Sequence, residues 1–393
     1  MKKFLVIIAD GMSGWPLKDY HNQTSMELAK TPNMDFLAKH GKLGLVKNVP
    51  DTLPAGSDVA NLAIFGYDPE KYYTGRAAIE AISQNINLEP ADIIFRANLV
   101  QIENNKMIDF TAKHIDSKVA KEIMDLLNKK LGNKYIAIRF INGVSYRNLL
   151  LIKNQKVKLK TTPPHDITGQ QIDNYLPVGE GSELIRKIMN DAEKVIKEDY
   201  LPQHRECKAN MVWLWGEGKK MKLPGFKKRY GLSGAVISAV DLIKGIGFAV
   251  GMDYVQVPGI TGFIDTNFKG KAIYALKALE DHDIVFIHIE AADEAGHMGD
   301  LPLKIKAIEK IDEEVLGTIL KLYSKKDLAI LLLPDHNTPI ELKTHGRDPV
   351  PFLIYHSDNV ENVTQQRFTE KDAQASNWTV EKGSDLLDIF LKD

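Results

Sequence analysis

The sequence is poor in the features that mark several large classes of protein. Its 393 residues include a single cysteine, Cys207, so no intrachain disulfide can form, which fits a reducing compartment. Basic and acidic residues number 51 and 52, so the chain lacks the basic excess of a dedicated nucleic-acid binder. No apolar run approaches the roughly 20 residues of a membrane span. We therefore expect a soluble, cytoplasmic protein that binds neither nucleic acid nor membrane.

The sequence does contain enough apolar material for a large core, with 44% hydrophobic residues over a length that suits about two domains. Three short stretches, at 4–11, 283–297 and 328–339, contain an apolar run without alternation, and in each an acidic residue lies beyond the apolar part: Asp10, Asp293 and Asp335. Such runs are typical of strands buried on both faces of a parallel sheet. Amphipathic helical patterns lie between them, for example at 301–323. The pattern predicts an α/β fold with a doubly wound, mostly parallel sheet.

The middle of the chain has a different pattern. Between about residues 81 and 207 the apolar runs are shorter and mix with two amphipathic helical stretches, at 118–132 and 182–201. We interpret this part as a smaller α+β domain, inserted into a discontinuous catalytic domain made of residues 1–80 and 208–393.

The acidic residues at the ends of the three apolar runs predict a common site. In doubly wound sheets ligands gather beyond the carboxyl ends of the strands. If the three strands are neighbours, Asp10, Asp293 and Asp335 converge at one edge of the sheet. Carboxylates packed together repel one another, so a positive group is expected among them.

Histidines beside these acids favour a metal ion as that positive group. Asp293 and His297 have the spacing D-x-x-x-H, which places both side chains on one face of a helix. His336 follows Asp335 directly, and His345 lies in the loop beyond. Taken singly, a D-x-x-x-H pair on a helix is usually a solvated face, and an Asp at a strand end is often a helix N-cap. Their conjunction favours a metal site, and carboxylate with imidazole suits zinc or manganese. We interpret His288, within the second apolar run, as a packed core residue.

A serine at a predicted helix start is the candidate nucleophile. Pro54, Ala55 and Gly56 form a turn, and Ser57 precedes a helical pattern. The simplest reading is a helix N-cap. The same position would also place the hydroxyl where a phosphate is favoured, and a coordinated metal ion would lower its pKa. The sequence alone leaves both readings open.

Ordered sequence blocks connect these residues to a known family. They are ADGM, AKTPNMDFLAKHG, PAGSDVANLAIFGYDPEKYYTGRAAIEA, FRANLV, GITGFIDTNFKGKA, DEAGHMGD and PDHNTPIELKTH. With these blocks the chain resembles the cofactor-independent phosphoglycerate mutases of the archaeal type, in the alkaline phosphatase superfamily, over nearly its whole length. The resemblance implies an alkaline-phosphatase-like sheet and interconversion of 3- and 2-phosphoglycerate through a phosphoserine at Ser57.

The resemblance also implies a ligand set for two divalent metal ions, manganese before zinc, cobalt or magnesium. Asp293, His297 and His345 would hold one ion. Asp10, Ser57, Asp335 and His336 would hold the other. The inserted domain would supply basic groups and close over the phosphorylated substrate, which limits loss of the phosphoryl group to water.

The match is weaker for the part of the family pattern that binds substrate. The family has an arginine-rich stretch resembling D-R-R-A-G-R where this chain has DFTAKHI at 109–115, with Lys113 and His114 in place of arginines. Arginine binds carboxylate and phosphate bidentately, whereas lysine acts as a point charge. This departure resembles a divergent branch proposed to act as a homoserine kinase. The substrate-side candidates are Arg96, Asn98, Arg147, His165, Asp166, Lys219 and Lys271.

Three functions therefore compete. The first is a metal-dependent phosphoglycerate mutase. The second is a phosphotransferase or phosphatase with the same metal centre, acting on homoserine or another small hydroxy compound. The third is a metal-stabilised binding protein without turnover, against which the number of candidate ligands argues, since structural metal sites are usually closed sets of four. The sequence does not indicate an oligomeric state.

Overall fold

The chain divides into two compact units. Unit 1 comprises Met1–Tyr73 and Lys222–Asp393, and unit 2 comprises Thr74–Met221. The computed structural model describes residues 2–135, 137–325, 327–358, 364 and 366–393. The boundaries differ from those expected at 80/81 and 207/208. The reason is that β9 (Met211–Lys219) pairs with β3 (Ile93–Glu103), and α5 (Arg76–Ser83) packs on both strands.

Unit 1 is built on an eight-stranded sheet with the order β11-β10-β12-β1-β13-β14-β2-β15. Its strands are β1 (Lys3–Ala9), β2 (Lys42–Val46), β10 (Gly234–Ile237), β11 (Asp253–Tyr254), β12 (Ile284–Ile289), β13 (Leu328–Leu333), β14 (Val350–His356) and β15 (Thr379–Val380). Among the strands that the structure describes in this sheet, only β14 runs antiparallel to its neighbours. The three apolar runs of the sequence form β1, β12 and β13, adjacent at the centre, where every residue from Phe4 to Ala9 is buried. The prediction of a mostly parallel α/β sheet is confirmed.

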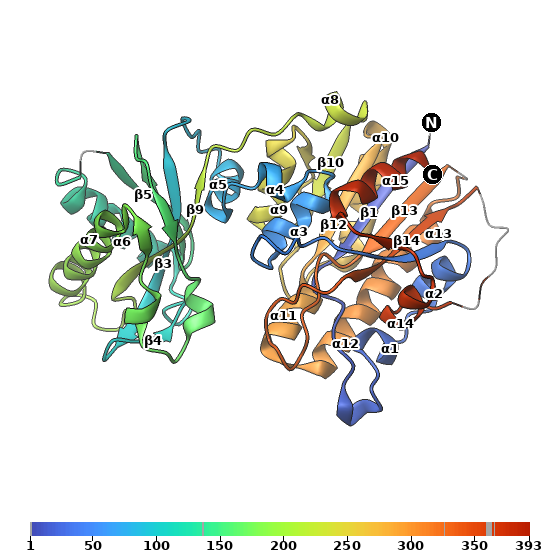
Figure 1. The fold of residues 1–393 in the computed structure, drawn as a ribbon, viewed down its shortest axis with the longest axis horizontal. Helices are drawn as coiled ribbons and strands as arrows, with labels where there is room; N and C mark the ends of the chain where they lie inside the picture. The colour runs from blue at the N-terminus through green and yellow to red at the C-terminus, as the bar shows by residue number, and fades with distance from the viewer. Residues whose placement is uncertain (1, 136, 326, 359–363, 365) are drawn as a thin grey trace. The chain divides into compact units, whose positions relative to one another are not determined.

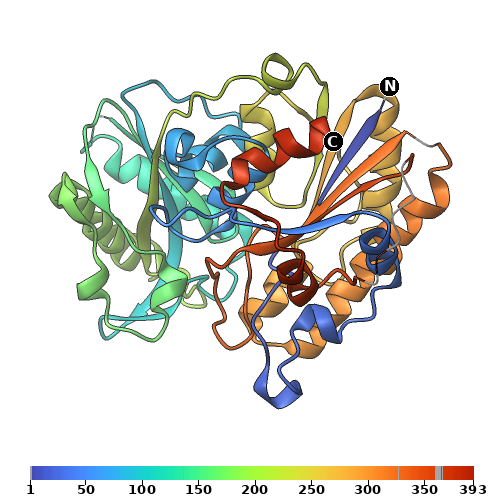
Figure 2. The same ribbon diagram turned by 45° about the vertical axis from the view of Figure 1, so that its right-hand side comes forward.

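Helices cover both faces of this sheet, because successive side chains of a strand point to opposite faces. Leu5 and Ile7 pack into the core shared with α2, α10 and α12. On the opposite face Phe4 contacts Phe390, and Phe286 stacks on Phe65 with ring centroids 4.1 Å apart. Figures 1 and 2 show the sheet between these two sets of helices. The helices of unit 1 are α1 (Ser25–Leu28), α2 (Pro32–Lys39), α3 (Ser57–Ile64), α4 (Pro69–Tyr72), α8 (Phe226–Tyr230), α9 (Asp241–Ala249), α10 (Phe268–Asp281), α11 (Ala291–Met298), α12 (Leu301–Lys310), α13 (Gly317–Leu322), α14 (Glu370–Ala375) and α15 (Leu386–Lys392).

Unit 2 is an α+β unit with an antiparallel sheet. The sheet has the path β4-β3-β6-β5, and β9 pairs with the other edge of β3. Its remaining strands are β4 (Lys106–Asp109), β5 (Ile138–Val144), β6 (Arg147–Ile152) and the separate pair β7 (Lys158–Lys160) and β8 (Val178–Glu180). Two amphipathic helices, α6 (Ser117–Leu131) and α7 (Ser182–Val195), bury their apolar sides with this sheet. Among the described residues, no helix is long and apolar enough to cross a membrane.

Candidate metal and phosphoryl-transfer site

Three neighbouring parallel strands bring acidic residues to one edge of the unit 1 sheet. β12 and β13 flank β1, and the register pairs Ile8 with both His288 and Leu333. Asp10 follows β1, Asp335 follows β13, and Asp293 lies in the first turn of α11, just beyond β12. The strands are neighbours that end at nearly the same level, so the condition under which the sequence predicts convergence is met.

The first cluster at this edge consists of Asp293, His297 and His345. Nε2 of His297 lies 3.1 Å from Oδ2 of Asp293 and 3.0 Å from Nε2 of His345. Nδ1 of His297 lies 3.0 Å from the carbonyl oxygen of Lys343, a contact that fixes the ring with Nε2 toward the cluster. Helix α11 supplies the first two residues at i, i+4 spacing, and the loop after β13 supplies His345. These three side chains are able to hold a metal ion.

A second cluster gathers around His336. Its Nε2 lies 3.0 Å from Oγ of Ser57, 3.6 Å from Oδ1 of Asp10 and 3.4 Å from Oδ2 of Asp335. Asp10 and His336 also form a group able to hold a metal ion with Asp293, which links the two clusters. The structure thus brings together all seven residues that the sequence singled out as nucleophile or ligands: Asp10, Ser57, Asp293, His297, Asp335, His336 and His345.

The electrostatics of the buried carboxylates favour a cation. Burial, together with the charges of Asp335 and Asp293, raises the pKa of Asp10 well above its ordinary value. Oδ1 of Asp10 is buried and, within the described part of the chain, has no hydrogen-bond partner. Burial also lowers the pKa of His336 to about 4, so its imidazole is neutral, the form that binds metals. The mixed oxygen and nitrogen donors therefore fit a divalent transition-metal ion.

The backbone at Gly11 permits the close packing of this edge. Gly11 has a φ of +58°, and a Cβ atom there would lie 2.4 Å from Oδ1 of Asp293. Its N–H donates a hydrogen bond of 3.2 Å to Oδ1 of Asp335. A side chain at this position would collide with Asp293, one of the candidate ligands, and with Thr338.

Ser57 lies at the start of α3, where the sequence left two readings open. The N-cap position of α3 is Gly56, and no side chain caps the helix. The hydroxyl of Ser57 instead contacts His336, while Asn61, one turn later, donates 2.8 Å to Oδ2 of Asp335. The capping interpretation is therefore wrong for the Ser57 side chain, which faces the ligand cluster.

The interpretation of His288 as a packed core residue was incomplete. His288 is buried, yet its Nε2 lies 3.0 Å from Oδ2 of Asp10. Asp10, His288 and Asp335 form a third group able to hold a metal ion. A signal was present in the sequence, since His288 breaks an apolar run two residues before its end. The missing information was the strand register. The register pairs His288 with Ile8, and Asp10, two residues after Ile8, points to the same side of the sheet.

In unit 2, Arg96 and Asn98 lie on one face of β3 beside Trp215. The guanidinium of Arg96 lies 4.7 Å from the centre of the Trp215 ring, and Nε1 of Trp215 donates 3.0 Å to Oδ1 of Asn98. Glu80, which the sequence did not single out, pairs with two arginines: its Oε1 accepts a hydrogen bond of 3.2 Å from Nε of Arg76, and its Oε2 forms an ion pair with Arg96, 3.0 Å from Nε. Burial lowers the pKa of Arg96 to about 10, with the charge of Glu80 opposing that shift.

The other predicted substrate residues are not all gathered there. Arg147 faces Asn98 in the strand register, and the ring of His165 lies 5.4 Å from that of Trp215, with Asp166 beside it. Lys219 lies opposite Ile93, toward the far end of β3. Lys271 belongs to unit 1, where its buried Nζ donates 2.8 Å to the carbonyl oxygen of His288.

The segment DFTAKHI at 109–115 has an unusual backbone. Three consecutive residues, Ala112, Lys113 and His114, have positive φ angles of 49°, 60° and 51°. The carboxylate of Asp109 accepts hydrogen bonds from the N–H groups of Thr111 and Lys113, which stabilise the turn. The left-handed conformation costs an L-residue roughly 1–2 kcal/mol, so the position of Lys113 is one that glycine would fill more easily.

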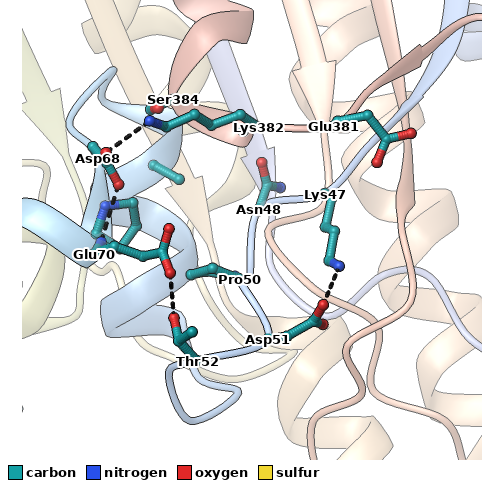
Figure 3. Close-up of a pocket in the computed structure, with 13 residues that line it drawn as sticks. Lys47, Asn48, Pro50, Asp51, Thr52, Asp68, Glu70, Glu381, Lys382 and Ser384 are labelled. Atoms are coloured by element: carbon teal, nitrogen blue, oxygen red, sulfur yellow. Dashed lines mark hydrogen bonds and ion pairs between the residues drawn. The ribbon is translucent and has the colours of Figure 1, made fainter.

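Unit 1 also contains a cavity of about 310 Å³ that is separate from these clusters. Charged residues that line the cavity form ion pairs with one another. Nζ of Lys47 lies 2.8 Å from Oδ2 of Asp51, and Nζ of Lys382 lies 2.7 Å from Oδ2 of Asp68 (Figure 3). No candidate ligand lines it. Asn48 connects the cavity to the site, because its Nδ2 donates 2.9 Å to the carbonyl oxygen of Asp335.

Known proteins resemble this chain over its whole length. Residues 38–201 match the family model described as 2,3-bisphosphoglycerate-independent phosphoglycerate mutase. A protein of that name from Methanosarcina barkeri (strain Fusaro / DSM 804) is 45% identical, with 99% of each chain covered. A protein named as a probable enzyme of this kind, from Geobacter sulfurreducens, is 42% identical, again with 99% of each covered.

Two solved structures are also similar. The PH0037 protein from Pyrococcus horikoshii has a TM-score of 0.80 at 29% identity, covering 100% of this chain and 97% of that one. The cofactor-independent phosphoglycerate mutase from Thermoplasma acidophilum DSM 1728 has a TM-score of 0.63 at 23% identity, covering 100% and 99%, and supports the fold.

The fold and the strand-end clusters define an α/β protein whose acidic residues and histidines are able to hold metal ions beside a serine hydroxyl. Within that class, the chain belongs to the family of 2,3-bisphosphoglycerate-independent phosphoglycerate mutases.

Proposed function

We propose that this protein is a metal-dependent phosphoglycerate mutase that interconverts 3-phosphoglycerate and 2-phosphoglycerate. The observation that carries the proposal is the position of the Ser57 hydroxyl, 3.0 Å from His336 within the buried acidic cluster, in a chain of this family. The single cysteine and the absence of a membrane-spanning helix in the described residues fit an enzyme that works in the cytoplasm.

Two divalent ions, with manganese the first choice, would be held by the two clusters. Asp293, His297 and His345 would hold one, and Asp10, Ser57, Asp335 and His336 the other; the bound charge would lower the pKa of the Ser57 hydroxyl and offset the repulsion among the carboxylates. The buried, unpartnered Oδ1 of Asp10 supports this assignment.

Ser57 acts as the nucleophile. In the first half-reaction its Oγ forms a bond to phosphorus as the bond from phosphorus to O3 of the substrate breaks; the hydroxyl proton leaves Ser57, and the departing oxygen gains a proton. In the second half-reaction O2 of the retained glycerate forms the new bond to phosphorus as the bond from phosphorus to Oγ of Ser57 breaks; the O2 hydroxyl loses its proton, and Oγ of Ser57 regains one. No phosphoryl group or proton is gained or lost overall.

Unit 2 binds the charged groups of the substrate in this proposal. Arg96, Asn98, Arg147, His165 and Asp166 supply donors and charge around Trp215, and Glu80 orients the guanidinium of Arg96. Lys219 and Lys271 remain predicted substrate residues, the second of them beside the strand-end site of unit 1.

A second function is suggested by the segment after β4, where the resemblance leads us to expect arginines and the chain has Lys113 and His114. That change suits a phosphotransferase or phosphatase acting on another small hydroxy compound. The deciding experiment is phosphorus NMR of the protein with manganese and 3-phosphoglycerate. Appearance of 2-phosphoglycerate supports the mutase, whereas phosphorylation of Ser57 without that product supports the second function.

A further inference from the structure

His288 has an environment that core packing does not explain. Its Nε2 lies 3.0 Å from Oδ2 of Asp10, yet this contact lacks the geometry of a hydrogen bond, and within the described residues Nε2 has no hydrogen-bond partner. The side chain is 1% exposed, so bulk water does not satisfy the nitrogen. A buried polar atom in this condition usually indicates an ion or a water molecule that the surrounding groups are built to bind.

The other ring nitrogen indicates which tautomer His288 adopts. Nδ1 lies 3.4 Å from Oγ of Ser238. That hydroxyl oxygen already accepts a hydrogen bond of 3.0 Å from the N–H of Val240 and lies 3.4 Å from the carbonyl oxygen of Val240, to which it donates. Its remaining lone pair is available for a proton on Nδ1. The lone pair of His288 then lies on Nε2, the arrangement in which a partner on one nitrogen orients the other toward a metal.

The carboxylates of two residues, Asp10 and Asp335, lie near His288. Ligand atoms of Asp10, His288 and Asp335 all lie within 4.8 Å of one another, and all three residues are buried. The backbone of His288 is held in place by Lys271, whose Nζ donates 2.8 Å to its carbonyl oxygen. A hydrogen bond from Nε2 of His288 to Asp10 would require the opposite tautomer, and the 3.0 Å contact between them does not have the geometry of a hydrogen bond.

We propose that His288 is a direct ligand, through Nε2, of a divalent cation that Asp10 and Asp335 also bind. The inference deepens the proposed function, on which it rests for the presence of metal ions at this edge. An added imidazole shifts the donor set from oxygen toward nitrogen, so this position selects a zinc-, manganese- or cobalt-like ion over magnesium.

The test uses Zn²⁺ alone, with the full chain and no phosphorylated substrate. In a crystal grown with zinc, an anomalous peak is expected about 2.0–2.1 Å from Nε2 of His288. By calorimetry, His288→Asn is expected to lower zinc affinity at one site by at least about 10-fold. The matched control is His356→Asn, which removes another buried histidine of the same sheet, 3.3 Å from Oδ2 of Asp393, and leaves zinc affinity unchanged.

Two results would overturn the inference. One is a zinc ion bound at this edge with Nε2 of His288 outside coordination distance and hydrogen-bonded to Asp10, which would make His288 a positioning residue. The other is unchanged zinc affinity in a folded His288→Asn protein. Failure of the proposed function is separable, because a protein that binds zinc through His288 but forms no 2-phosphoglycerate refutes the mutase and leaves this ligand in place.

Discussion

Oγ of Ser57 lies 3.0 Å from Nε2 of His336, although 279 positions separate the two residues in the chain. The contact joins the start of α3 to the loop after β13, so the candidate nucleophile and a candidate metal ligand are held by two different elements of unit 1. A hydroxyl in this position is close enough to share an ion with His336, and it is not engaged in capping its own helix.

Replacement of Ser57 by alanine is expected to abolish phosphoryl transfer and to spare metal binding. The variant loses the oxygen that bonds to phosphorus in the proposed mechanism, so kcat should fall by at least about 10³-fold. The carboxylates and histidines remain, so manganese should still raise the melting temperature. Ser376→Ala, which removes a hydroxyl bonded to the carbonyl oxygen of Ala373, serves as the control. Turnover at the wild-type rate in Ser57→Ala would disprove the assignment of the nucleophile.

Arg96→Lys is expected to weaken substrate binding more than it slows chemistry. Lysine keeps the charge but loses the planar group that lies over Trp215 and reaches Glu80. KM for phosphoglycerate should rise about tenfold or more, with a smaller change in kcat. Arg139→Lys, an exposed position in the same unit, should leave both constants unchanged. Equal KM values for the two variants would exclude Arg96 from the substrate site.

Lys113→Gly tests the backbone of the turn after β4. Glycine adopts a φ of +60° without the steric cost that lysine bears, although it adds entropy to the unfolded chain. The free energy of unfolding should stay level or rise by up to about 1 kcal/mol. Lys129→Gly, at an exposed site inside α6, should instead lose about 1 kcal/mol. Similar losses in both proteins, measured by denaturant unfolding, would show that Lys113 is not under strain.

Glu370 is expected to make stability depend on pH. Burial raises the pKa of this carboxyl above 4.5, against hydrogen bonds from Thr24, Gly14 and Ser13 that lower it. Because the folded state holds the proton more tightly than the unfolded state, stability should fall as pH rises from about 4.5 through the folded pKa. Glu370→Gln removes this ionisation. The difference in unfolding free energy, wild type minus variant, should therefore decrease over that range. A difference that is flat or increases would contradict the shift.

The sequence was sufficient for the parts of the fold that rest on local pattern. The strands β1, β12 and β13 could be recognised because a strand buried on both faces is a continuous run of apolar residues, without alternation between apolar and polar positions. The acidic residues behind them predicted one site because neighbouring parallel strands end together. The domain boundaries were displaced because β9 joins unit 2 through long-range pairing with β3, which no local pattern records.

The parts that could not be predicted depend on register and on side-chain partners. His288 appeared to be core because an apolar run hides a single polar residue until the strand beside it is known. Glu80 went unnoticed because its importance comes from gathering Arg76 and Arg96, two residues on different elements. Lys271 carried no signal for its buried bond to the carbonyl oxygen of His288.

The most direct measurement of the central claim is mass spectrometry of the intact protein and its peptides after rapid mixing with manganese and 3-phosphoglycerate, followed by an acid quench. The account predicts an added phosphoryl group on the peptide that contains Ser57, formed and consumed at rates compatible with turnover and absent when the metal is removed by a chelator. Conversion of 3-phosphoglycerate to 2-phosphoglycerate with no phosphoryl group on Ser57 at any time would contradict it.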